Sequence, residues 1–303
     1  MKSNIVKQIK ALKEKKNAVI LSHYYTSAEV QAISDYVGDS FYLAKIAKQS
    51  DADVIVFCGV SFMGESAKIL NPGKTVLMPD LSADCPMAHM VAKGKIEEMR
   101  RKYKDLAVVC YINSTAELKC QSDVCVTSSN AIKIVKALPN ENIFFIPDKN
   151  LGRFVKEQIP EKNIILNEGF CPIHAQLTAS QVMAEKNKHP SAKVLTHPEC
   201  DKSVLEISDY IGSTAEIIEY AKESLDDEFI ICTEDGVAYK LMQDNPEKRF
   251  YFCDKHPPCA DMKLCTLEKI HHVLETGGNE VKISDEMRKK ALAPLDRMLK
   301  LAK

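Results

Sequence analysis

The sequence contains no tryptophan, few aromatic residues and almost no net charge. Of its 303 residues, 7% are aromatic, and 41 basic side chains balance 42 acidic ones to leave a formal charge of −1 at pH 7. Because neither sign of charge prevails, the composition gives no reason to expect nucleic acid or a membrane surface as a partner. Hydrophobic residues at 45% and charged residues at 27% are typical of a globular protein and exclude a disordered chain. We therefore expect the partners to be small molecules.

Long hydrophobic runs are also missing. The longest apolar runs, such as residues 52–60, fall far short of the about 20 residues that a membrane-spanning helix needs. The N-terminal segment MKSNIVKQIKALKEKKN carries lysines throughout and lacks the apolar stretch of a signal peptide. We therefore expect a cytoplasmic protein, and disulfides are rare in that reducing compartment. The eleven cysteines accordingly indicate metal, cluster or catalytic use for a few and core packing for the rest.

The chain repeats itself three times. Short β-rich runs alternate with helical patterns, which indicates an α/β protein with parallel strands. The run at residues 17–25 has counterparts at 106–113 and 192–199, at offsets of 88 and then 86 residues, and each copy continues to an aspartate. A second and a third apolar strand follow at the same offsets, at residues 54–58, 142–146 and 228–232, and at residues 75–79, 163–167 and 249–253.

These landmarks predict three α/β/α units with parallel sheets, related by a pseudo-threefold axis around a central active site. Each unit has about 87 residues and three predicted strands. We place the units at residues 1–90, 91–177 and 178–265, and expect the C-terminal helices in 266–303 to join the first unit. The N-terminal segment, with Ile5, Ile9 and Leu12 at helical spacing, is expected to pack there as well.

Polar side chains end the first strand of every copy. Ligands of parallel α/β units bind beyond the carboxyl ends of the strands, where side chains two residues apart share a face. The equivalent pairs are all polar or ionisable: His23 and Tyr25, Tyr111 and Asn113, His197 and Glu199. This pattern indicates that the three copies contribute to one shared site.

A hydroxyl residue begins a predicted helix in every copy, at Ser40, Ser128 and Thr214, with Ser129 and Ser213 beside two of them. One such residue would be read as an ordinary helix cap. Three helix starts that converge on one cavity would instead attract phosphate or carboxylate with their free N–H groups. The repeat therefore predicts an anionic substrate.

Three cysteines occupy one equivalent loop of each copy. Cys85, Cys171 and Cys259 are spaced by 86 and 88 residues, so a threefold axis would bring their thiolates together. Three ligands without a fourth favour a [4Fe–4S] cluster that leaves one iron free of protein ligands. Zinc held by the three cysteines with His89 or His174 stays open as an alternative.

The other cysteines have simpler interpretations. Cys265, six residues after Cys259, is the one competing ligand. Core positions in strands are expected for Cys58, Cys110, Cys232 and Cys253, and helix or loop positions for Cys120, Cys125 and Cys200. Exposed positions are expected for His189, His256, His271 and His272.

Several segments resemble the quinolinate synthase family, whose members are iron–sulfur enzymes of NAD biosynthesis. The resemblance covers nearly the whole chain. It lies in HYY (23–25) followed by GDS (38–40), GVSFMGESAKILNP (59–72), PDLSADCPMA (79–88), YINSTAELK (111–119), PDKNLG (147–152), GFCPIH (169–174), HPEC (197–200), GST (212–214) and CADMKLCTLE (259–268).

The resemblance implies a triplicated α/β/α fold and a transferase-type reaction. Iminoaspartate and dihydroxyacetone phosphate would condense to quinolinate with loss of phosphate and two waters. The open iron of a [4Fe–4S] cluster on Cys85, Cys171 and Cys259 would act as a Lewis acid. An iminoaspartate-producing oxidase is the implied functional partner.

The family also implies roles for individual residues. Tyr25, His197 and Glu199 are the candidates for proton transfer, with Glu199 the preferred base. His174 either contacts substrate or supports the site by hydrogen bonding. Substrate binding is implied for His23, Ser40, Tyr111, Asn113, Ser128, Ser213 and Thr214. A non-catalytic iron–sulfur sensor or carrier and a three-cysteine zinc hydrolase are the rival functions, and a regulatory disulfide of Cys253 or Cys265 stays open.

Overall fold

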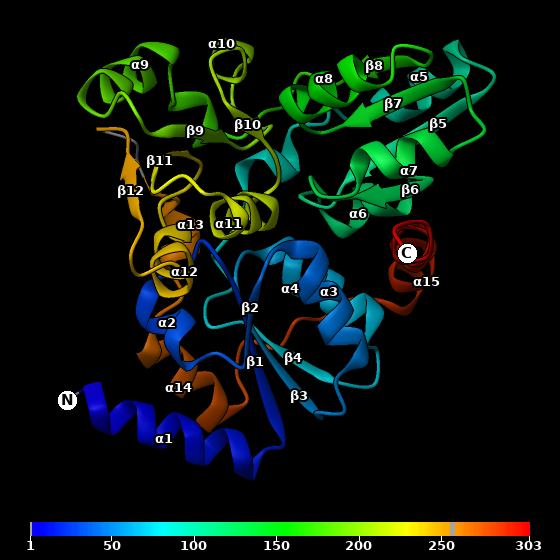
Figure 1. Cartoon of the computed structure of the whole chain (residues 1–303). Coiled ribbons are helices and arrows are strands. Elements are labelled where there is room, and N and C mark those ends of the chain that lie inside the picture. Colours follow the sequence, from blue (N-terminus) through cyan, green and yellow to red (C-terminus); the bar gives the residue numbers. More distant parts are fainter. Residues whose placement is uncertain (1, 255–257) are drawn as a thin grey trace.

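The computed structural model describes residues 2–254 and 258–303, and its strands form three separate four-stranded sheets (Figure 1). All strand pairs in these sheets are parallel. The strand order is the same each time, with the first strand of the repeat beside a short edge strand. The predicted α/β fold of three repeated units is therefore confirmed.

The first sheet has the order β2-β1-β3-β4. Its strands are β1 (Ala18–His23), β2 (Tyr36–Gly38), β3 (Val54–Cys58) and β4 (Thr75–Leu77). The helices of this repeat are α2 (Ala28–Ile33), α3 (Ser40–Gln49) and α4 (Ser61–Leu70), and the short 3₁₀ turn Pro86–His89 follows.

The second sheet has the order β6-β5-β7-β8. Its strands are β5 (Leu106–Tyr111), β6 (Val124–Val126), β7 (Asn142–Ile146) and β8 (Asn163–Leu166). The helices are α5 (Lys95–Lys102), α6 (Ala116–Cys120), α7 (Ala131–Ala137) and α8 (Lys149–Gln158), with a 3₁₀ turn at His174–Gln176.

The third sheet has the order β10-β9-β11-β12. Its strands are β9 (Lys193–Thr196), β10 (Tyr210–Ile211), β11 (Glu228–Cys232) and β12 (Arg249–Phe252). The helices are α9 (Ala179–Lys188), α10 (Lys202–Leu205), α11 (Thr214–Glu223), α12 (Val237–Asp244) and α13 (Ala260–Lys263).

The prediction of three strands per unit was wrong, because each repeat adds a fourth. The additional strands β2, β6 and β10 have only two or three residues, too few for a periodic hydrophobic pattern to identify them. They lie in the segment that follows the repeated aspartate.

The repeated aspartate has the same structural role in every copy. The side chains of Asp35, Asp123 and Asp209 accept hydrogen bonds of 2.7–2.8 Å from backbone N–H groups of β1, β5 and β9. Each carboxylate therefore fixes the start of the edge strand against the first strand of its sheet. The same bond in three places explains why this position repeats in the sequence.

The terminal helices pack on different parts of the molecule. α1 (Lys2–Lys15) and α14 (Leu267–Thr276) lie together, and Ile9 and Ile270 join one apolar cluster against the first sheet. α15 (Asp285–Leu301) packs against α6 and β6 of the second repeat and α4 of the first, at the right of Figure 1. The unit boundaries at 90/91 and 177/178 stay a prediction. None of the described helices is long and apolar enough to cross a membrane.

Candidate active site

A cavity of about 110 Å³ is lined by residues of all three repeats. Thirteen of the fourteen side chains predicted for the site line it: His23, Tyr25, Ser40, Cys85, Tyr111, Asn113, Ser128, Cys171, His174, His197, Glu199, Thr214 and Cys259. The pairs predicted at the ends of the first strands thus meet, because β1, β5 and β9 direct their carboxyl ends toward one place.

Ser213 is the exception. Its Oγ accepts the N–H of Glu216, the Glu216 side chain accepts the N–H of Ser213, and together they form a capping box at the start of α11. Ser213 is fully buried and does not line the cavity. Its neighbour Thr214, the first residue of α11, does.

The three hydroxyl residues differ in their position relative to the helix that follows. Ser40 and Thr214 are the first residues of α3 and α11, capped by Asp39 and Ser213. The prediction that a helix begins at Ser128 was wrong, since α7 begins only at Ala131. Ser128 lies in a turn, where the carbonyl of Thr127 accepts the N–H groups of Asn130 and Ala131. All three residues nevertheless line the cavity.

His23 and His197 are neutral and have a defined tautomer. Burial lowers the pKa of each to about 3, against the opposing charge of Glu199. The Nδ1 atom of His23 accepts the N–H of Tyr25 at 3.2 Å, and Nδ1 of His197 accepts the N–H of Glu199 at 3.3 Å. We assign the ring proton to Nε2 in both, so each histidine has one N–H to offer to a ligand.

Glu199 is buried and ionised. Burial alone would raise its pKa, but His174 and His197 outweigh burial and lower it to about 2. His174 Nδ1 lies 2.8 Å from Glu199 Oε2, and the rings of His174 and His197 stack. In the described part of the chain, Glu199 Oε1 and Asn113 Oδ1 are buried without a hydrogen-bond partner. Two acceptors of the site are therefore left for a ligand.

A chain of hydroxyl groups connects His174 to Tyr25. His174 Nε2 lies 2.9 Å from Thr233 Oγ1, and the Tyr25 hydroxyl lies 2.7 Å from both Thr233 Oγ1 and Thr214 Oγ1. Burial and the charge of Glu199 raise the pKa of Tyr25 well above its usual value, so its hydroxyl keeps the proton. The geometry can pass a proton between Glu199, His174, Thr233 and Tyr25.

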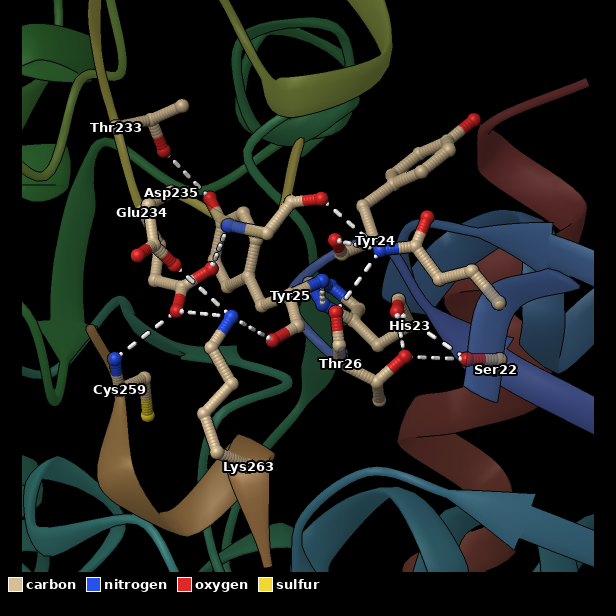
Figure 2. A network of polar contacts seen from close by, with 12 residues as sticks. Ser22, His23, Tyr24, Tyr25, Thr26, Thr233, Glu234, Asp235, Cys259 and Lys263 are labelled. Atoms are coloured by element: carbon tan, nitrogen blue, oxygen red, sulfur yellow. Dashed lines mark hydrogen bonds and ion pairs between the residues drawn. The ribbon is translucent and has the colours of Figure 1, made fainter. Parts of the chain in front are cut away.

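Thr233 was missed in the sequence because nothing in its surroundings there indicates chemistry. It directly follows β11, at the position that Pro147 holds in the second repeat, so the offset of 86 residues gave no hydroxyl match. Figure 2 shows it beside Tyr25, together with Glu234 and Lys263, which the sequence also did not reveal. The sequence signal for this loop was its place directly after a predicted strand, since other predicted site residues also lie at strand ends.

The three predicted ligand cysteines line the cavity and are half-buried. Burial raises the pKa of all three thiols, to about 11 for Cys259 and further for Cys85 and Cys171. Each sulfur also receives backbone N–H groups from the turn that follows it, from Ala88, His174 and Met262 respectively, and these amides oppose that rise. Three sulfurs that face one cavity with amides directed at them fit a metal centre with thiolate ligands.

The predicted alternative ligands differ in position. His89 does not line the cavity; it is exposed, and its Nε2 lies 2.7 Å from Asp84. Donor atoms of Cys171, His174 and Glu199 lie within 4.8 Å of one another and could hold a metal ion. Cys265 is buried between α14 and the first sheet, away from the cavity.

The remaining cysteines are structural. All eleven cysteines belong to the described residues and are free thiols. Core positions in strands are confirmed for Cys58, Cys110 and Cys232, whereas Cys253 is buried but follows the end of β12. The loop or helix position expected for Cys125 was wrong, because it lies on β6 opposite Cys110 of β5. His272 is exposed as expected, His189 stacks on Tyr251 and is half-buried like His271, and His256 lies outside the described residues.

Comparison with known proteins identifies the family. Residues 7–300 match the family described as quinolinate synthetase A protein. A quinolinate synthase of Fusobacterium nucleatum is 54% identical over 297 residues, 97% of this chain and 98% of that protein. Quinolinate synthases of Clostridioides difficile and Caldicellulosiruptor saccharolyticus are each 48% identical, over 100% and 98% of this chain and 99% and 98% of their own lengths. The chain that builds this cavity therefore belongs to the quinolinate synthetase A family.

Proposed function

We propose that the cavity condenses iminoaspartate with dihydroxyacetone phosphate to quinolinate, phosphate and two waters, as a step of NAD biosynthesis. The atoms of this reaction balance without an oxidant or reductant, so it needs acid–base and Lewis-acid chemistry only. One observation carries the proposal. Three cysteines, the ionised Glu199 and three hydroxyl residues, drawn from all three repeats, line a single cavity in a chain of this family.

A [4Fe–4S] cluster is the cofactor we propose, held by Cys85, Cys171 and Cys259. The donor set supports it, because three half-buried thiols from separate repeats line one cavity with backbone amides directed at each sulfur. When bound, the iron that lacks a protein ligand supplies a Lewis acid for the loss of water. His174, whose Nδ1 lies 3.2 Å from Cys171 Sγ, supports the thiolate by hydrogen bonding, whereas the charge of Glu199 opposes it.

The anionic groups of the substrates are bound by neutral donors. His23 and His197 each offer one Nε2–H, and Ser40, Ser128 and Thr214 offer hydroxyls, two of them on the first residues of α3 and α11. Tyr111 and Asn113 hold the substrate near the cysteines, and Ser213 positions Thr214 by capping α11. Because none of the described residues that line the cavity is a lysine or an arginine, the site suits small carboxylates and phosphate without attracting polyanions.

Proton transfer is assigned to Glu199, His197 and Tyr25. A base must be ionised before it accepts a proton, and Glu199 is. Substrate carboxylates entering the same buried cavity raise the pKa of Glu199 toward the working pH, because like charges disfavour ionisation. The chain through His174 and Thr233 returns the proton to Tyr25, which acts as the donor.

The surroundings of the enzyme follow from its substrates. Iminoaspartate hydrolyses readily in water, so we propose functional coupling to an oxidase that produces it. A cytoplasmic location, with neither nucleic acid nor membrane as partner, agrees with the balanced charge of the chain.

An anaerobic assay tests the proposal. Purified protein is mixed with dihydroxyacetone phosphate and iminoaspartate generated in situ, and quinolinate is measured together with iron, sulfide and zinc content. We expect quinolinate, with iron and sulfide in the protein. An intact cluster without quinolinate would favour a sensor or carrier, and zinc without sulfide would favour a zinc hydrolase; either result overturns the proposal.

A further inference from the structure

The backbone N–H of each ligand cysteine is bonded to a carboxylate. The N–H of Cys85 donates to Asp84 Oδ1 at 2.8 Å, and the N–H of Cys171 donates to Asp148 Oδ2 at 3.2 Å. In the third repeat the N–H of Cys259 donates to Glu234 Oε1 at 2.9 Å, as Figure 2 shows. Each bond thus fixes the backbone nitrogen of a cysteine, which is bonded to the Cα from which the side chain with the sulfur extends.

Two of the three carboxylates occupy equivalent positions. Asp148 and Glu234 are 86 residues apart, each two residues beyond the third strand of its repeat, β7 or β11. The first repeat has Val60 at this position, and there Asp84, next to the cysteine, supplies the bond instead. The same bond is therefore formed by two different routes, which indicates that the bond itself is required.

Electrostatic energy alone disfavours a carboxylate next to a cysteine thiolate. Asp148 and Glu234 each oppose ionisation of the neighbouring thiol. A negative side chain beside a thiolate is unfavourable unless it contributes something other than charge. What it contributes here is an acceptor that holds a backbone amide in one orientation.

In the third repeat, Lys263 extends this bond to Tyr25. Its Nζ lies 2.9 Å from Glu234 Oε1 and from Asp235 Oδ1, and donates to the backbone carbonyl of Tyr25 at 2.9 Å. Gly236 of the same loop packs against Tyr25 so closely that an added Cβ would lie 2.7 Å from the Tyr25 backbone. One side chain therefore connects the loop of Cys259 with the residue proposed as proton donor (Figure 2).

We infer that Asp84, Asp148 and Glu234 are positioning residues that each orient one ligand cysteine through its backbone N–H, and that Lys263 couples the third of them to Tyr25. The inference rests on the proposed function only in taking the cysteines as ligands and Tyr25 as a catalytic residue. The bonds themselves belong to the protein without cofactor, so they are tested there.

The first test measures how fast each cysteine of the reduced, metal-free protein reacts with iodoacetamide, with peptide mass spectrometry to separate the sites. Asp84→Ala is expected to speed Cys85 at least about fivefold and the other two less than about twofold, because the bond to the Cys85 N–H that limits local opening is lost together with the contacts to Ser61 and His89. Glu234→Ala is expected to speed Cys259 in the same selective way. Asp84→Asn keeps an oxygen acceptor and is expected to restore the wild-type rate at Cys85.

All three carboxylates have further partners: Asp148 caps α8 through Leu151, Asp84 also accepts from Ser61 and pairs with His89, and Glu234 also accepts from Gly236 and pairs with Lys263. Asp84 and Glu234 carry the test because neither caps a helix, and Asp84→Asn separates loss of the acceptor from loss of the charge. Selective acceleration at the neighbouring cysteine supports the inference. Equal acceleration at all three cysteines, or none, overturns it. Circular dichroism establishes that each variant is folded.

The second test addresses Lys263 by hydrogen exchange of peptides that cover residues 23–27. Lys263→Met is expected to speed exchange there, and alkylation of Cys259, by about five- to tenfold.

Lys240→Met is the matched control, because Lys240 is about as exposed and pairs with Asp244 at 2.6 Å on the outside of α12. Lys263→Arg keeps the charge and is the second variant to use if Lys263→Met does not fold. Its exchange and alkylation rates are expected to lie between those of the wild-type protein and of Lys263→Met. Unchanged exchange in both Lys263 variants overturns the coupling. Neither readout depends on turnover, so a failed quinolinate assay would leave this result interpretable.

Discussion

The second and third repeats have the same strand order but different chemistry where their strands end. Tyr111 and Asn113 of the second repeat are neutral, whereas His197 and Glu199 at the equivalent positions of the third are a histidine and an ionised carboxylate. Directly after β7 the second repeat has Pro147. At the equivalent position, directly after β11, the third repeat has Thr233, which is hydrogen-bonded to Tyr25. The backbone has stayed the same while the side chains at the cavity have diverged.

The difference shows how a repeated fold divides the work of one site. At the end of its first strand the second repeat supplies contacts that do not titrate, and its His174 joins the proton chain only from the later turn, whereas the third repeat supplies Glu199 and Thr233 to that chain. The strands themselves are interchangeable apolar segments buried in both repeats. Substitutions at the strand ends should therefore affect binding in one repeat and turnover in the other.

The largest effect is expected within the second repeat itself. Cys171→Ser removes a proposed cluster ligand, so we expect loss of the cluster and of all activity. Cys110→Ser changes a cysteine buried in β5 that does not line the cavity, and we expect it to keep the cluster. Iron, sulfide and anaerobic absorbance are measured for both. Equal retention in the two variants would refute the choice of ligand.

The comparison between repeats is tested most directly at the equivalent residues Glu199 and Asn113. Glu199→Gln removes the proposed base and is expected to lower kcat by about 10²- to 10⁴-fold with the cluster intact. Asn113→Ala removes a binding contact and is expected to raise KM about tenfold with a smaller change in kcat. Steady-state kinetics under anaerobic conditions separates the two. A wild-type rate for Glu199→Gln would remove Glu199 as the base.

A smaller effect is expected at Thr233, which has no hydroxyl counterpart in the second repeat. Thr233→Val keeps the shape but leaves His174 and Tyr25 each without one partner, so we expect kcat to fall by about 10- to 100-fold. Thr233→Ser restores the hydroxyl and should recover most of the rate. If valine and serine variants are equally slow, the role of Thr233 is packing and the proton chain is wrong.

The smallest effect concerns stability and pH. His197 keeps a pKa of about 3 when folded but regains its ordinary value of 6.5 when unfolded. Below that value only the unfolded chain binds the proton, so stability is lost as the pH falls. Between about pH 7.5 and about pH 5.5 the loss amounts to about 1.4 kcal/mol per histidine.

Urea unfolding of the metal-free protein at the two pH values measures this dependence. His197→Gln should reduce the loss of unfolding free energy between the two pH values by the contribution of one histidine. His23→Gln should reduce it equally, because His23 is buried in the same way. The second repeat has Tyr111 at this position, which does not titrate in this range. An unaltered pH dependence in both variants would contradict the low pKa values.

The sequence was sufficient to predict the repeats and thirteen residues that line the cavity, because most of its signals recur at fixed offsets. Cys85, Cys171 and Cys259 could be recognised in this way without any structure. Thr233 and Lys263 could not, because their roles depend on contacts with Tyr25 of the first repeat that no offset records. Glu234 stands 86 residues after Asp148, but that offset alone did not indicate a bond to the backbone of Cys259. The position of α15 and the short edge strands were missed for a related reason, since docking and two-residue pairing leave no periodic pattern.

Each four-stranded sheet is built from one continuous stretch of the chain, and among the described residues it is joined from outside only at the edge strand β4, where Leu77 forms an isolated bridge with Glu280. During synthesis a repeat can therefore complete its strand pairing before the next one has left the ribosome. The cavity cannot form in the same way, because Cys259 and Lys263 are made only after the first two repeats, and α15, which packs across those two repeats, follows them. The repeats can pair their strands one by one as they are made, whereas delivery of a cofactor must wait until all three repeats have been made.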